Sequence, residues 1–93
     1  MVHAIAFLTV TNPESMAQYR EKAGEALAKH GGAVVQVSRS PATLDGAPEL
    51  PDVVALLSFP DAAAAHAWAN DPELASIHDL RRGAGKSNIF VME

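Results

Sequence analysis

Two segments of the chain are apolar on both of their alternating faces, and this feature limits the folds open to it. Residues 2–10 (VHAIAFLTV) and 53–59 (VVALLSF) read as β-strands that lack the polar–apolar alternation of a half-exposed strand. In the first, aliphatic side chains occupy one face, and Ile5 and Phe7 occupy the other. Each of these strands therefore needs a covering layer on both sides.

A helix is predicted between them, within residues 11–32. Asn12 is a favourable N-cap, and Pro13 suits the first helical position. Gly31 and Gly32 end the helix, and His30 is expected to interact with the carbonyl groups of its last turn.

The remaining elements follow from turn and capping residues. Residues 39–52 contain three prolines and are predicted to be mostly loop, with a short edge strand near Ala42–Leu44. Asp61 and Asp71 are caps for two consecutive helices. These helices are predicted at 61–70 and 71–82, and two more strands at 33–38 and 86–93.

The only Trp lies two positions after a His in the first of these helices. At 100° per residue, Ala64, Ala67 and Trp68 share one face, and His66 lies about 160° from Trp68. We therefore expect Trp68 to pack inward and His66 to face water. Their spacing then reflects helix packing and not a catalytic pair.

The predicted order of elements indicates a single ferredoxin-like α+β domain, a βαββαβ fold with a four-stranded antiparallel sheet, over residues 1–93. Its helices can cover only one face of the sheet, so the second apolar face of the inner strands stays open. Burial of apolar surface contributes about 25 cal/mol per Å². A second copy of the chain is the simplest cover. We therefore predict a homodimer in which two sheets form a dimeric α+β barrel.

Composition excludes several classes of function. A net charge of −4 argues against a nucleic-acid partner. The chain has no Cys, and no apolar run approaches the roughly 20 residues of a membrane span. The N-terminus also lacks the features of a secretion signal. We expect a cytoplasmic protein with no nucleic-acid or membrane partner.

Three segments together resemble one protein family. They are 12-NPESMAQYREKAGEALAKHGG-32, 58-SFPDAAAAHAWANDPEL-74 and 79-DLRRGAGKSNIFVME-93. In order and spacing they are similar to the family named domain of unknown function 1330 (DUF1330), which belongs to the dimeric α+β barrels. The resemblance implies a ferredoxin-like protomer and a dimer, and no settled activity. The wider group includes cofactor-free monooxygenases, small-molecule cyclases and isomerases, and haem proteins.

The chain departs from the family pattern at charged positions. Family members often carry Arg-Gly-Gly where this chain has 37-VSR-39, and a Glu where it has Ser58. They commonly open the third strand with Arg, where this chain has Asp52 and Val53. The family arginine of the third segment is retained as Arg81. These losses favour a more apolar ligand.

Arg81, His78 and His3 are the candidates for catalysis. Arg81 shares a helix face with apolar residues, which suits either a ligand anion or a structural ion pair. His78 lies at the edge of the same apolar helix face. It is either a general base or a residue at the boundary between core and surface. His3 shares a strand face with Ile5 and Phe7, and lies either in a cavity or at the rim of the sheet.

Four residues are candidates for substrate binding. Tyr19 offers a phenol, although such a ring is often part of a core. Ser58 and Asn88 lie among apolar strand residues, and Trp68 is expected to face inward from its helix. No nucleophile elbow, phosphate-binding glycine loop or paired-histidine metal motif occurs, and we expect no metal and no cofactor.

Two functions remain open. The first is an enzyme or accessory protein that performs cofactor-independent acid–base chemistry, such as cyclisation, isomerisation or oxygenation, on a mostly apolar small molecule. The alanine-rich composition and the fold favour a place in bacterial secondary metabolism, by analogy alone. The second is a non-catalytic dimer that binds or carries a small molecule.

Overall fold

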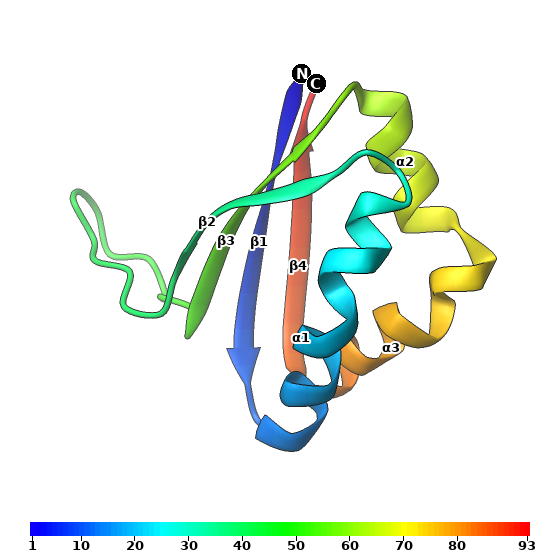
Figure 1. Ribbon diagram of the computed structural model, residues 1–93. Coiled ribbons are helices and arrows are strands. Elements are labelled where there is room, and N and C mark those ends of the chain that lie inside the picture. The colour runs from blue at the N-terminus through cyan, green and yellow to red at the C-terminus, as the bar shows by residue number, and fades with distance from the viewer.

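The computed structural model, which describes residues 1–93, places the two doubly apolar strands at the centre of one sheet. β1 (Val2–Val10) pairs antiparallel with β3 (Val53–Phe59) on one side and with β4 (Gly85–Met92) on the other. β2 (Ala33–Ser38) pairs with β3, so the strand order is β2-β3-β1-β4. This arrangement confirms the predicted ferredoxin-like fold (Figure 1).

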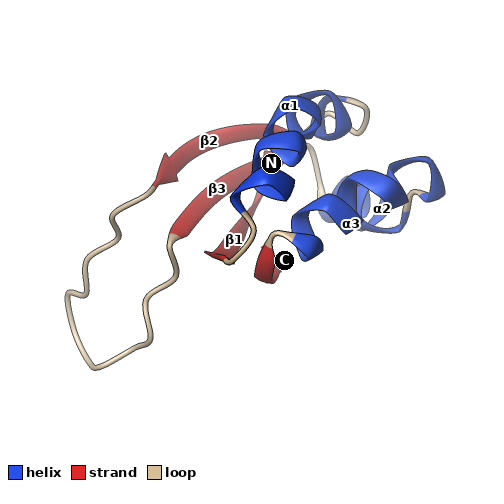
Figure 2. Cartoon of the chain, turned by 90° about the horizontal axis from the view of Figure 1, so that it is seen from below, coloured by secondary structure: helices blue, strands red, loops and turns tan.

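All helices lie on one side of the sheet, and Figure 2 shows this layering along the strands. They are α1 (Pro13–Ala28), α2 (Ala62–Asn70) and α3 (Ala75–Gly83), with a 3₁₀ turn at Pro72–Leu74 between the last two. The predicted caps are present: Asn12, Asp61 and Asp71 each accept a hydrogen bond from a backbone N–H two or three residues later. No helix is both long enough and apolar enough to span a membrane.

The hydrophobic core lies between the helices and the sheet. Trp68 from α2 packs against Phe59 from β3, with ring centroids 5.7 Å apart, and both side chains are buried. As predicted, His66 on the same helix is exposed. The other buried members of this cluster are Ala4, Ala26, Leu27, Leu57, Ala65 and Leu74.

The opposite face of the sheet has no helix over it, as the sequence predicts. We call it the open face, and define it by His3, Ile5 and Phe7 of β1 with their cross-strand neighbours. Those neighbours include Val54, Leu56, Ser58, Asn88, Phe90 and Met92. Phe90 remains 60% exposed in the single chain, although its ring makes an edge contact with Phe7.

The long connection between β2 and β3 differs from the prediction. Residues 39–52 contain no strand, and the expected edge strand at Ala42–Leu44 does not form. The segment projects from the end of the sheet as an extended loop (Figure 2), where no strand lies beside it to supply ladder hydrogen bonds. Leu44 at its tip is fully exposed.

Two helical details also differ. Ala67 is exposed, whereas Ala65 is buried beside Trp68, because the inward face of α2 is centred between Ala65 and Trp68. The second predicted helix begins as a 3₁₀ turn and becomes α-helical only at Ala75. The cap at Asp71 therefore closes the tighter turn and not the α-helix itself.

Candidate functional site

A large apolar pocket lies between α1 and the sheet. Its volume is about 730 Å³, and twelve of its sixteen lining residues are hydrophobic. Small side chains create the space: Ala6 and Ala55 lie opposite each other on β1 and β3, and both line the pocket. Tyr19 of α1 also lines it, as does Arg81 of α3. We call this space the helix-side pocket.

A smaller pocket of about 320 Å³ adjoins it between α2, α3 and the sheet. Arg81 and Ile89 line both spaces and so form the boundary between them. Trp68, Ser87 and Arg82 are among the other residues of the smaller pocket. Arg81 is therefore a polar group common to the two cavities on the helix side of the sheet.

Arg81 is a buried cation, with a side chain only 6% exposed. Its guanidinium carbon lies 5.6 Å from the centre of the Tyr19 ring and 5.4 Å from that of Trp68, both within cation–π range. Nε donates to Ser87 Oγ at 3.2 Å, and Nη1 donates to Nδ1 of His78 at 2.8 Å. Aromatic faces and neutral acceptors thus surround this positive charge.

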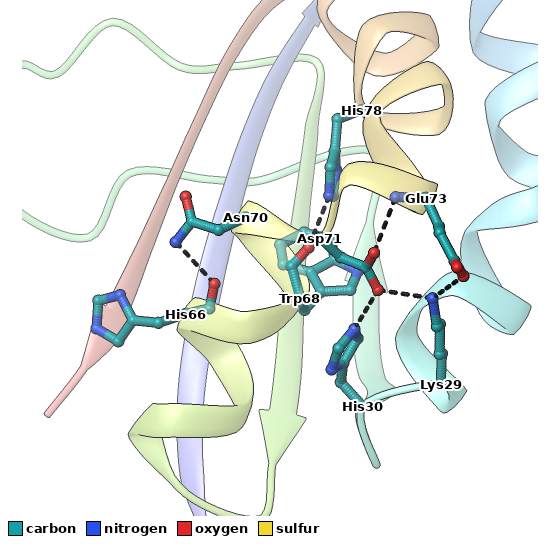
Figure 3. Close-up of polar contacts among 8 residues, drawn as sticks. All are labelled: Lys29, His30, His66, Trp68, Asn70, Asp71, Glu73 and His78. Carbon is teal, nitrogen blue, oxygen red and sulfur yellow. Dashed lines mark hydrogen bonds and ion pairs between the residues drawn. The ribbon is translucent and has the colours of Figure 1, made fainter.

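His78 is fully enclosed and uses both ring nitrogens within the protein. Its Nε2–H donates to the backbone oxygen of Trp68 at 2.9 Å, as Figure 3 shows. That carbonyl is free to accept because Trp68 lies in the last turn of α2, where carbonyls lack helical partners. A carbonyl only accepts, so the proton is on Nε2 and Nδ1 is the lone pair that accepts from Arg81.

Burial is the main reason that the pKa of His78 is lowered from its ordinary value, because the charged ring would lose its hydration. The positive charges of Arg81 and Arg82 act in the same direction, and the bond to the Trp68 carbonyl opposes them in part. His78 is therefore neutral at pH 7. Proton transfer by His78 would require one of its two hydrogen bonds to break.

Trp68, which contacts His78, has a buried hydrogen-bond donor without a partner. Its ring meets the His78 ring edge-on, with centroids 4.7 Å apart. Its Nε1–H is the one buried side-chain nitrogen or oxygen in the structure that has no hydrogen-bond partner. Buried donors of this kind are rare in native proteins, because each costs free energy when left unpaired.

A separate charged cluster joins the end of α1 to the turn between α2 and α3 (Figure 3). Asp71 accepts from Lys29 at 2.8 Å, and the same carboxylate oxygen shares a hydrogen bond with His30. Lys29 also pairs with Glu73. The bond from Lys29 is the largest of the effects that hold the pKa of Asp71 well below its usual range. His30 thus binds a carboxylate on another element, and not the carbonyls of its own helix as expected.

The predicted site residues divide between the two faces of the sheet. Arg81, His78, Trp68 and Tyr19 meet on the helix side. His3, Ser58 and Asn88 lie on the open face, where His3 is the cross-strand neighbour of Ser58. The sheet separates the two groups, so a single chain does not bring them together.

The open face has a cavity of its own under the 39–52 loop. Its volume is about 520 Å³, and its lining includes Phe7, Val54, Asn88 and Phe90. Asn88 is the one predicted site residue that lines it. No group of three or more His, Cys, Asp or Glu residues is arranged to hold a metal ion.

Several polar residues of the helix-side cavities were not predicted from the sequence. Arg20 and Arg39 line the large pocket, and Arg82 and Ser87 line the smaller one, where Ser87 accepts from Arg81. Ser87 was detectable, because it alternates with Ile89 on β4 and so shares its face. The position of Arg39 after β2 gave no local signal of a shared pocket with α1.

Solved structures with the same fold cover almost the whole chain. A protein of unknown function from Rhodopseudomonas palustris is 22% identical, with a TM-score of 0.76 over 98% of this chain and 79% of that one. A dimeric ferredoxin-like protein of unknown function from Jannaschia sp. CCS1 is 14% identical, with a TM-score of 0.67 over 99% of this chain and 97% of that one.

SnoaB, a cofactor-independent oxygenase from Streptomyces nogalater, is also 14% identical, with a TM-score of 0.67 over 99% of this chain and 90% of its own. At such identities the likeness concerns the fold alone. No curated protein matches the chain in sequence. The family model described as "Domain of unknown function (DUF1330)" matches residues 1–93, and the chain therefore belongs to the DUF1330 family.

Proposed function

We propose that the protein binds a small, mostly apolar molecule in the helix-side pocket and acts on it by cofactor-independent acid–base chemistry, as a homodimer. The observation that carries this proposal is a cavity of about 730 Å³ with a mainly aliphatic lining and a buried arginine in its wall. Ligand sites in proteins are typically apolar clefts of this size with few polar groups.

The chemistry we propose uses Arg81 as an electrostatic group. Its guanidinium would stabilise negative charge that develops on a substrate oxygen, as in an enolate formed during cyclisation, isomerisation or oxygenation. His78 is the nearest candidate for proton transfer, provided that ligand binding releases its Nδ1 from Arg81. The likeness in fold to a cofactor-independent oxygenase supports this class of reaction, and a role in secondary metabolism extends the same analogy.

The homodimer is proposed from the open face. Ile5, Leu56 and Phe90 form a continuous apolar patch across three paired strands, and no part of the helical layer covers it. The dimeric state of the Jannaschia protein with the same fold supports this arrangement. His3 and Ser58 would then belong to the dimer interface, and they would reach a ligand only if that interface encloses one.

A non-catalytic binding or carrier role is the second candidate. The observation that favours it is the occupation of both nitrogens of His78, which leaves no free general base beside Arg81. Native mass spectrometry of protein from its source distinguishes the two roles. A single copurified compound that is released unchanged supports a carrier, whereas a mixture that converts from one compound to another during incubation supports an enzyme.

The pocket itself is tested with the neutral fluorescent probe N-phenyl-1-naphthylamine. We expect the probe to bind wild type, and Ala55→Leu, which fills the floor of the helix-side pocket, to weaken binding by about tenfold or more. The matched control is Val54→Leu, the neighbouring residue on the open face. Binding that is lost in Val54→Leu and kept in Ala55→Leu, or absent from wild type, contradicts the proposal.

A further inference from the structure

The helix-side pocket carries positive charge and no negative charge. Its charged lining residues are three arginines, Arg20, Arg39 and Arg81, and it contains no Asp or Glu. This bias contrasts with the whole chain, where eleven acidic residues outnumber seven basic ones. Arg20 and Arg39 are exposed and lie at the rim, whereas Arg81 is buried in the wall.

Arg81 lacks a counter-ion inside the protein. The ion pairs of the structure involve Lys29, His30, His66 and Arg82, and none includes Arg81. A buried charge without a partner is costly, since it has lost its hydration without gaining an opposite charge. Its position is therefore best explained by an anion that arrives with a ligand.

The guanidinium of Arg81 also has N–H groups without a hydrogen-bond partner in the protein. An arginine has five N–H groups, and here one on Nε and one on Nη1 have partners, Ser87 and His78. Trp68 Nε1 is the only unpaired side-chain donor that is sealed from solvent. Nη2 of Arg81 has no partner and is not sealed from solvent, so we take its N–H groups to face the cavities that this residue lines.

His78 determines where those donors point. Its Nε2–H is held by the Trp68 carbonyl, so only the lone pair of Nδ1 faces Arg81. A neutral ring in this tautomer accepts one N–H of Nη1 and contributes no charge of its own. The guanidinium is thus positioned without being neutralised, which an aspartate or glutamate in the same place would not achieve.

We infer that the helix-side pocket takes an apolar organic anion, with a single carboxylate or enolate bound by Arg81, and that His78 is the positioning residue for Arg81. The inference rests on the proposed function, because it names the ligand class of the same pocket. The rim arginines attract the anion, and Arg81 binds it at the wall. A neutral molecule of the same shape would leave the charge of Arg81 uncompensated.

The test uses two competitors with the same ring system, 1-naphthaleneacetate and 1-naphthaleneacetamide, to displace bound N-phenyl-1-naphthylamine. In wild type we expect the carboxylate to compete at a concentration about tenfold or more below that of the amide. In Arg81→Met we expect the two competitors to become equivalent, with binding of the neutral probe retained. Arg20→Gln should reduce the preference by less than Arg81→Met does, since Arg20 is exposed.

The positioning role is tested by two variants of His78. Gln offers an oxygen to Arg81 and an N–H to the Trp68 carbonyl, so His78→Gln should keep most of the carboxylate preference. His78→Leu removes both partners and should reduce the preference while the neutral probe still binds. A purely structural His78 predicts the opposite pattern, in which both variants weaken the probe and the carboxylate together.

The possible failures are distinguishable. If wild type binds the neutral probe in the helix-side pocket but the acetate and the amide compete equally, the anion inference is wrong and the proposed pocket stands. If the probe does not bind there, the proposed function fails first. If Arg81→Met removes the preference while His78→Leu leaves it unchanged, the anion site stands and the positioning role of His78 is overturned.

Discussion

The two faces of the sheet are built from the same strands and differ in almost every other property. The helix side buries a tryptophan, a histidine and an arginine around cavities, and its strands contribute small residues such as Ala6 and Ala55. The open face presents larger side chains, including Ile5, Phe7 and Phe90, and leaves them partly exposed. The helix side therefore forms its core within a single chain, whereas the open face leaves apolar surface that the proposed dimer would bury.

The largest expected effect is on the helix side. Trp68→Ala removes a ring that packs against Phe59, His78 and Arg81. We expect it to lower the free energy of unfolding by about 3–5 kcal/mol, as is usual for a large aromatic side chain in a core. Urea denaturation measures the loss, which should be the same at low and high protein concentration. A loss below about 1 kcal/mol would show that this side is not the packed core.

A charge on the open face should affect assembly more than folding. Phe90→Asp places a carboxylate on the most exposed ring of the apolar patch, and we expect it to convert a dimer into a monomer at micromolar concentration. Light scattering measures the mass, and Ala63→Asp, an exposed position on α2, is the matched control. If wild type has the mass of a single chain, the open face is not buried by a second copy, and the proposed difference between the two faces is wrong.

The smallest expected effect is a pH dependence that belongs to the helix side alone. Folding lowers the pKa of His78 from its ordinary value of 6.5. Below pH 6.5 the unfolded chain therefore binds a proton at His78 more readily than the folded chain does. The free energy of unfolding should therefore be constant with respect to His78 above that pH and fall as the pH drops below it. The groups around His78 are Arg81, Arg82 and Asp79 on its own helix, with the Trp68 carbonyl and ring from α2.

Denaturation curves between pH 5 and 8 measure this effect, and His78→Gln should remove it. His66→Gln, at an exposed position, is the control and should leave the pH dependence in place. Asp71 does not interfere, because its pKa is lowered from 3.8 and its stabilising contribution is lost only at still lower pH. An unchanged curve in His78→Gln would show that the buried imidazole does not titrate in this range.

Much of the fold was predictable because its signals are local. The caps at Asn12 and Asp61 act on N–H groups within three residues, and the opposite orientations of His66 and Trp68 follow from helical periodicity. The missing strand at Ala42–Leu44 shows the limit of this reasoning. A strand forms only where a partner lies beside it, and sequence preference alone does not reveal the partner.

Sequence reasoning named Arg81, His78, Trp68 and Tyr19 among its candidates, but it did not predict how these side chains are arranged. Arg81 and His78 are three positions apart on one helix, so their contact was within reach of sequence reasoning. The Trp68 carbonyl that sets the tautomer of His78 depends on where α2 ends and how α3 folds back. His3 was assigned to the correct strand face, but only the tertiary structure shows that this face lies across the sheet from Arg81.

The amino-acid sequence by itself determined the elements, their order, and the need of β1 and β3 for cover on both faces, because periodicity and capping act within a few residues. Tertiary structure decided that Arg81 is buried without a counter-ion, that three arginines share one pocket, and that His78 is neutral. These properties depend on the removal of water and on neighbours distant in the chain. Burial and electrostatic pairing are set by the assembled molecule, and no single segment contains them.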